Sequence, residues 1–133
     1  MKTRTVDTNI LVRLLLKDGS EQWAKVAELA AEFYFIVAPT VLLETEWVLR
    51  SRYNFHRDNI LDLFHRLADS EGIILIEEPR MMKALDAFSK GMDFADAMHV
   101  CLKAEDSVFI TFDRDLVKLA KKHLPEANVE LAF

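Results

Sequence analysis

The sequence predicts an α/β fold: a single-domain α/β/α sandwich with a mostly parallel sheet of four or five strands. Short apolar runs alternate with longer stretches of helical periodicity, which is the pattern of strands joined by helical crossovers. The length of 133 residues, with 51% hydrophobic and 29% charged residues, fits one domain over residues 1–133 with a continuous core. No linker, repeat or low-complexity segment interrupts this pattern.

The expected strands are five short apolar runs. They are TRTV, FIVA, IILI, VFIT and VELA, at residues 3–6, 35–38, 73–76, 108–111 and 129–132. Two helical stretches are expected after each of the first three runs, and one after the fourth. Pro39 and Pro79 lie near expected helix starts, and Pro125 follows an expected helix that ends in lysines. The positions of the prolines therefore agree with these helix boundaries.

Composition excludes several classes of function. No apolar run is long enough to span a bilayer, and MKTRTVDT lacks a signal-peptide core, so a cytoplasmic protein without a membrane partner is expected. The one cysteine, Cys101, is expected to be a reduced thiol in the core. The three glycines are too far apart to form a phosphate-binding loop, and the net charge of −5 disfavours binding nucleic acid by bulk charge.

Aspartates stand where two of the predicted strands end. Asp7 follows TRTV and Asp113 follows VFIT, and each precedes a helical pattern. Aspartate is a good N-cap residue, so both could serve only to cap helices. Because the carboxyl ends of parallel strands meet at one edge of a sheet, the two side chains could also share a site. Asp115 fits the first helical turn, where a carboxylate suits the helix dipole.

The helix predicted over TVLLETEWVLRSRY carries two glutamates that point in different directions. Glu46 is expected on the wet face, paired with Arg50 four residues later. Glu44 is in register with the apolar Val41 and Val48, so its carboxylate either needs a partner or reaches water from the edge of the apolar stripe.

A third acidic segment is GMDFADAMHVCLKAED, which reads as an amphipathic helix. Asp93 and Asp96 share its polar stripe, and Asp93 also looks like an N-cap with Asp96 three residues on. Crowded carboxylates repel one another unless a cation lies among them. Oxygen-only ligands suit Mg²⁺ or Mn²⁺, and such ions activate water for in-line hydrolysis of phosphodiesters.

These fragments, in this order, resemble the PIN-domain nucleases, and most closely the VapC-like toxins of prokaryotic toxin–antitoxin pairs. VDTNILVRLL resembles the opening strand and helix of that family, LLETEWVLR its acidic third helix, GMDFADAMHV its central acidic helix and FITFDRDL its last acidic strand end. The resemblance covers nearly the whole chain. It implies a metal and catalytic quartet of Asp7, Glu44, Asp96 and Asp113, with Asp93, Asn9 and Thr111 in support.

The same resemblance implies a Mg²⁺- or Mn²⁺-dependent endoribonuclease, commonly a homodimer, that is held inactive by a small VapB-like antitoxin. DNA would be bound only through that antitoxin. Arg13 and Lys17, spaced to share a helix face, are the candidates for RNA contact, and Lys118, Lys121 and Lys122 end a later helix. Phe35 is expected in the core, and one of the two tryptophans at an interface.

Two other interpretations remain open. An acid-cluster phosphatase or phospho-accepting receiver also places acidic residues at strand ends, but Asp7 is followed by Thr8 and Asn9 rather than by a second acid. A partner-binding module without nuclease activity, acting in a toxin–antitoxin-like complex, would use the same fold for binding alone.

Overall fold

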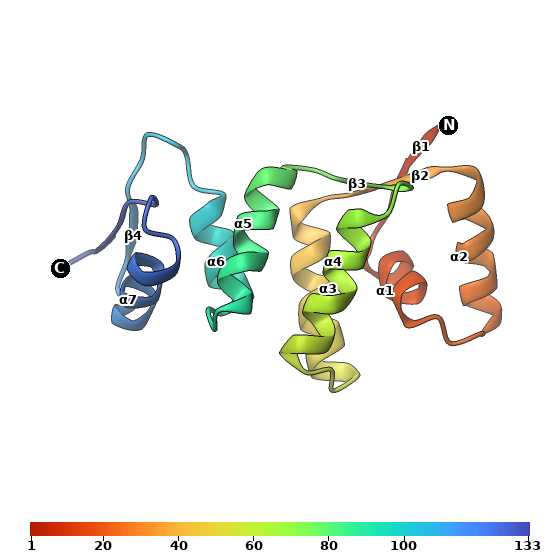
Figure 1. The fold of residues 1–133 in the computed structure, drawn as a ribbon, viewed down its shortest axis with the longest axis horizontal. Coiled ribbons are helices and arrows are strands. Elements are labelled where there is room, and N and C mark those ends of the chain that lie inside the picture. The colour runs from red at the N-terminus through yellow and green to blue at the C-terminus, as the bar shows by residue number, and fades with distance from the viewer. The chain divides into compact units, whose positions relative to one another are not determined.

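The computed structural model describes all 133 residues as seven helices and five short strands. The chain divides into two units, Met1–Glu78 and Pro79–Phe133, which are described separately below. Figure 1 shows the elements along the chain, from the red N-terminal strand to the blue C-terminal segment.

The first unit contains a parallel sheet of three strands in the order β1-β2-β3. The strands are β1 (Thr3–Thr5), β2 (Tyr34–Val37) and β3 (Ile73–Leu75). Thr5 pairs with Ile36, and Ile36 with Ile74, so the strands run in step toward one edge of the sheet. The central strand carries the most deeply buried side chains of the sheet: Phe35 and Val37 are each 1% exposed. The prediction that Phe35 lies in the core is therefore confirmed.

Four helices connect these strands in pairs, as the periodicity predicted. They are α1 (Thr8–Leu16), α2 (Glu21–Glu32), α3 (Pro39–Arg52) and α4 (Arg57–Asp69). Ser20 caps α2 with its side chain, and Pro39 occupies the first turn of α3, where its missing N–H costs nothing. Helix α1 packs against both α2 and α3. Apolar side chains from all four helices form the core, among them Leu11, Val26, Leu42, Leu49, Ile60 and Phe64.

The second unit contains three helices and a parallel pair of strands. They are α5 (Glu78–Ser89), α6 (Phe94–Cys101), β4 (Phe109–Thr111), α7 (Arg114–His123) and β5 (Val129–Leu131); only the first residue of α5 belongs to the other unit. Phe88 and Phe94 bring α5 and α6 together, with ring centroids 5.2 Å apart. The Arg80 guanidinium donates hydrogen bonds of 3.4 Å to the carbonyls of Leu102 and Lys103, just after α6.

The α/β class, the order of the elements and the parallel strand pairing are confirmed. The five strands pair as a sheet of three and a sheet of two, so each sheet uses the strands of one unit. No helix has the length and apolar character that crossing a bilayer requires. Cys101, expected in the core, is half-buried at the end of α6, and burial raises the pKa of its thiol.

Candidate active site

Asp7 lies between β1 and α1 and caps that helix. One carboxylate oxygen, Oδ1, accepts a hydrogen bond of 3.1 Å from the backbone N–H of Ile10. This satisfies one of the first-turn N–H groups that have no partner within the helix. The residue is exposed, so the second oxygen stays available to a ligand. The capping role is confirmed, and it leaves room for a second one.

Glu44 is held at the start of α1 by a residue that the sequence did not single out. The Thr8 hydroxyl donates a short hydrogen bond to Oε1 of Glu44. Thr8 is only 7% exposed and follows Asp7 directly, so this bond brings the carboxylate from α3 to the end of α1 that Asp7 caps. A buried hydroxyl in a first helical turn needs a partner, and that need is the one signal that could have pointed to Thr8.

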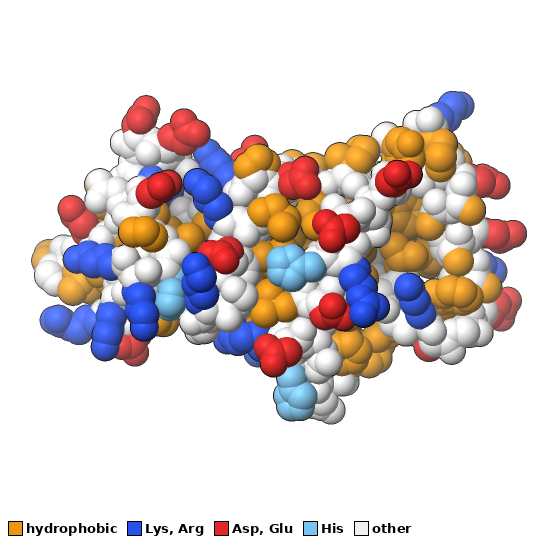
Figure 2. Space-filling view, in the orientation of Figure 1, with side chains coloured by type: hydrophobic (Ala, Val, Ile, Leu, Met, Phe, Trp, Pro, Cys, Tyr) orange, Lys and Arg blue, Asp and Glu red, His pale blue; other side chains and the backbone are white.

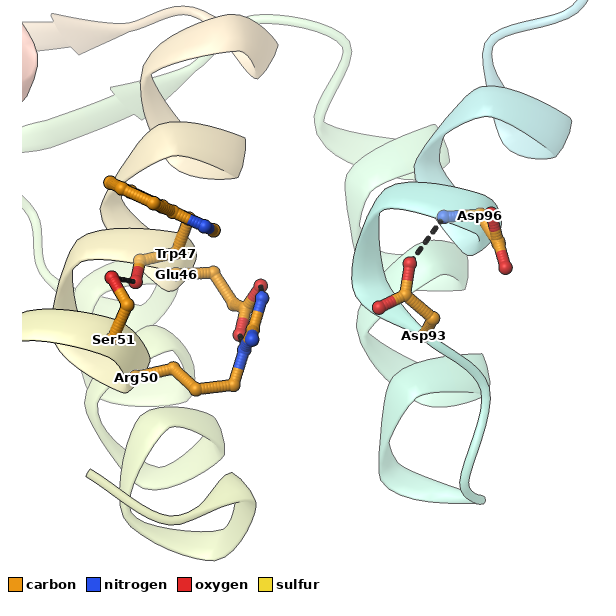
Figure 3. A network of polar contacts seen from close by, with 6 residues as sticks. All are labelled: Glu46, Trp47, Arg50, Ser51, Asp93 and Asp96. Carbon is orange, nitrogen blue, oxygen red and sulfur yellow. Dashed lines mark hydrogen bonds and ion pairs between the residues drawn. The ribbon is translucent and has the colours of Figure 1, made fainter. Parts of the chain in front are cut away.

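Of the two glutamates of α3, Glu46 differs in burial from what the periodicity predicted, whereas Glu44 reaches water, as one of the two alternatives for it allowed. Glu44 is exposed, whereas Glu46, expected on the wet face, is only 2% exposed. The predicted pair with Arg50 is confirmed: Nε of Arg50 lies 2.8 Å from Oε2 of Glu46, and a second guanidinium nitrogen lies 3.4 Å from Oε1 (Figure 3). Two charge-assisted bonds compensate the buried carboxylate, which explains why a glutamate is tolerated there.

In the second unit, Asp93 and Asp96 form the start of α6. The Asp96 backbone N–H donates a hydrogen bond of 3.1 Å to Oδ2 of Asp93, as Figure 3 shows, so the predicted N-cap is confirmed. Burial raises the pKa of the Asp96 carboxyl, and the nearby carboxylates of Asp93 and Asp113 raise it further. His99, one turn along α6, acts in the opposite direction.

Asp113 caps α7 in the same way that Asp7 caps α1. Its Oδ1 accepts hydrogen bonds from the backbone N–H groups of Asp115 and Leu116, at 3.0 and 3.1 Å. The Thr111 hydroxyl accepts a bond of 3.0 Å from the Asp113 N–H, so Thr111 fixes the turn that presents the carboxylate. Asn9, the other polar residue expected in support, is exposed in the first turn of α1.

The predicted acidic residues therefore form two groups, one in each unit. Asp7 and Glu44 lie in the first, and Asp93, Asp96 and Asp113 lie in the second. Within neither unit do three or more His, Cys, Asp or Glu side chains gather closely enough to hold a metal ion by themselves. The donors are all carboxylate oxygens, the set that hard divalent cations such as Mg²⁺ or Mn²⁺ prefer. The repulsion at Asp96 is of the kind that a bound cation relieves.

The spacing of Arg13 and Lys17, the two candidates for RNA contact, predicted that they share a helix face. The structure shows that they do not. Helix α1 ends at Leu16, and Lys17 adopts a left-handed backbone conformation with φ of 48°, which turns it off the helix. Arg13 lies 3.3 Å from Oδ2 of Asp18 in an ion pair. The periodicity argument failed because it extended the helix one residue too far.

The fold and these carboxylates define an α/β protein with acidic side chains at the carboxyl ends of parallel strands and at the starts of helices. A family model described as PIN domain matches residues 5–122, and the chain belongs to the PIN domain family. Membership places it in a class whose members are in general metal-dependent nucleases. Comparisons with curated proteins and with solved structures found no match.

Proposed function

We propose that this protein is a Mg²⁺- or Mn²⁺-dependent endoribonuclease that hydrolyses RNA phosphodiester bonds. The observation that carries the proposal is the position of Asp96, which is half-buried beside the carboxylates of Asp93 and Asp113. Burial and these neighbours raise its pKa, and a bound cation would balance the charge of the three carboxylates. Membership of the PIN domain family supports hydrolysis of nucleic acid in general, and RNA is the substrate we assign.

In this proposal acidic side chains hold the catalytic ion. Asp7, Glu44, Asp96 and Asp113 supply carboxylate oxygens, while Asp93, Asn9 and Thr111 orient them through hydrogen bonds. Thr8 joins this supporting set because its hydroxyl fixes the Glu44 carboxylate. A divalent cation held by such a set would lower the pKa of water and stabilise the charge that develops on the phosphate.

The chain's own residues would position these groups. The N-caps at Asp7 and Asp113 each use one carboxylate oxygen for the helix, which leaves the other oxygen for the site. The starts of α1 and α7 also present backbone N–H groups beside Asp7 and Asp113, and helix N-termini favour anionic groups such as a phosphate.

The biological role we propose is that of a toxin in a VapBC-like toxin–antitoxin pair. The protein would act in the cytoplasm as a homodimer, with a small antitoxin that blocks the site and supplies any contact with DNA. The order of the acidic fragments along the chain supports this narrower assignment. Co-expression with the product of the adjacent open reading frame tests it: the pair should purify as a complex, and the complex should not cleave RNA.

Incubation of the purified protein with labelled RNA, with Mn²⁺ and with EDTA, tests the nuclease activity. Asp7→Asn and Asp96→Asn keep the size of each side chain and remove its charge. We expect cleavage by the wild type with Mn²⁺, and about a hundredfold less from either variant, because one ligand to a catalytic ion is lost. Equal cleavage by all three proteins would show that the activity comes from a contaminant.

A further inference from the structure

We infer that the exposed face of α7 is an RNA-backbone binding surface that leads away from Asp113. Four cations, hereafter the α7 stripe, define it: Arg114, Lys118, Lys121 and Lys122. All four are exposed. They recur at spacings of three and four residues, so they lie on one side of the helix. Figure 2 shows Lys and Arg side chains gathered over this part of the molecule.

The four cations of the α7 stripe lie together on one helix and have no acidic partners. On other helices, several lysines and arginines pair with an acid four residues earlier on the same helix. Such pairs join Lys25 to Glu21, Arg66 to Asp62 and Lys90 to Asp86, at 3.9, 3.0 and 2.9 Å. None of the four stripe residues makes an ion pair or a side-chain hydrogen bond. In a chain of net charge −5, this concentration of uncompensated charge points to an anionic ligand.

Helix stability alone does not account for the stripe. Lys121 and Lys122 lie in the last turn, where cations complement the helix dipole. Arg114 is the first residue of α7, where the dipole disfavours a cation, and Lys118 lies in the middle of the helix. Positive charge is therefore also present at positions of α7 where the helix dipole does not stabilise it.

Three properties favour a nucleic-acid strand as the ligand. Along the axis, Arg114, Lys118 and the adjacent Lys121 and Lys122 are separated by roughly 4.5 to 6 Å, so these three positions can meet successive charges of an extended, regularly charged chain. The stripe begins beside Asp113, whose carboxylate caps the same helix, so a strand bound along it ends at a proposed catalytic group. The apolar side of α7, with Leu116, Val117 and Ala120, is buried, so the helix itself has no apolar face to insert into a lipid surface.

This inference rests on the proposed RNA substrate, but binding can be measured without cleavage. The protein carries Asp96→Asn and is held in EDTA, and the probe is a fluorescent single-stranded oligoribonucleotide. The test variant is Lys118→Gln/Lys121→Gln/Lys122→Gln. The matched control, Lys25→Gln/Lys83→Gln/Lys90→Gln, removes the same charge from lysines that pair with acids. Arg114 is left unchanged because it adjoins Asp113.

We expect the test variant to bind RNA about tenfold more weakly at low salt than the control variant does. The slope of log K against log salt concentration should fall by about 2, because each phosphate contact on a single strand contributes about 0.7. Equal affinities and slopes for the two variants would overturn the inference. Failure of the unsubstituted protein to bind RNA at low salt would overturn it too, and would direct attention to an acidic protein partner.

The outcome is separable from that of the proposed nuclease. Stripe-dependent RNA binding by a protein that never cleaves RNA with Mn²⁺ would uphold the inference and refute the nuclease. Cleavage that depends on Mn²⁺ and on Asp96, together with RNA binding that is insensitive to the stripe, would uphold the nuclease and refute the inference. Far-UV circular dichroism of both triple variants checks that α7 remains folded, since exposed Lys→Gln changes cost little helix propensity.

Discussion

The Thr8 hydroxyl donates a hydrogen bond to the Glu44 carboxylate and so joins the start of α1 to α3. Substitution Thr8→Val keeps the shape of the side chain and removes the donor. We expect a fall in RNA cleavage of roughly tenfold, because an acidic group without its orienting bond is less well placed, and a loss of about 1 kcal/mol in stability.

Thr5→Val is the matched control for Thr8→Val, because Thr5 is an exposed strand residue whose side chain makes no hydrogen bond. Cleavage assays and urea denaturation compare the two variants. Unchanged cleavage by Thr8→Val, at equal folded fraction, would show that the hydroxyl serves the fold alone.

Asp113 is expected to have two separable roles, as a helix cap and as a ligand. Asp113→Ser keeps a capping oxygen but removes the carboxylate, and Asp113→Ala removes both. Both variants should lose RNA cleavage by about a hundredfold or more, as expected for loss of a ligand to a catalytic ion. Only the alanine variant should lose stability, by about 1 kcal/mol, measured by denaturant unfolding. Substantial cleavage by the serine variant would assign Asp113 to capping only.

The raised pKa of Asp96 gives a pH dependence with a definite sign. The folded protein holds the proton more tightly than the unfolded chain does, so this group makes the protein less stable as pH rises through the window above its ordinary value of 3.8. In EDTA at neutral pH, Asp96→Asn should therefore raise Tm. Asp106→Asn, at an exposed acid in the loop between α6 and β4, is the control of equal charge and should leave Tm nearly unchanged.

Adding Mn²⁺ should reverse the order of these melting temperatures. An ion that binds only the folded state stabilises it by RT ln(1 + [L]/Kd), so Tm of the wild type should rise with Mn²⁺ concentration. The rise should be much smaller for Asp96→Asn, which lacks one ligand. Parallel increases in the two proteins would place the ion elsewhere.

Glu46 and Arg50 form a partly buried pair that should stabilise the fold without taking part in the reaction. The Glu46 side chain is 3% exposed, whereas Asp62 in the pair with Arg66 is 60% exposed. Glu46→Ala should cost about 1.5 to 3 kcal/mol and Asp62→Ala at most about 0.5 kcal/mol, measured by urea denaturation. Cleavage per folded molecule should survive Glu46→Ala and be lost in Glu44→Gln.

The sequence predicted the order of all twelve elements because hydrophobic periodicity and caps act locally. Asp7, Asp93 and Asp113 were each predicted as N-caps, and each accepts the backbone bonds that the prediction required. Burial within α3 was not predictable in the same way. It depends on which neighbouring side chains cover each residue, and Arg50 compensates a buried Glu46 that periodicity had placed in water.

The supporting contacts were also beyond the sequence, because they join residues far apart along the chain. Thr8 and Glu44 are separated by 36 positions, and no pattern within either segment pairs them. The position of Lys17 was not predicted for a different reason: Lys17 itself adopts a left-handed backbone conformation, which ends α1 and changes the direction of its side chain.

The capping bonds of Asp7 and Asp113 have a consequence for how an ion would be captured. Each carboxylate already has its rotamer fixed by folding, through bonds to backbone N–H groups. The conformational entropy of these side chains is therefore lost when the helices form, and little remains to be lost when a cation arrives. Without an ion, the carboxylates of Asp7 and Asp113 should therefore keep the same rotamers, and ion binding should proceed without a change in either helix.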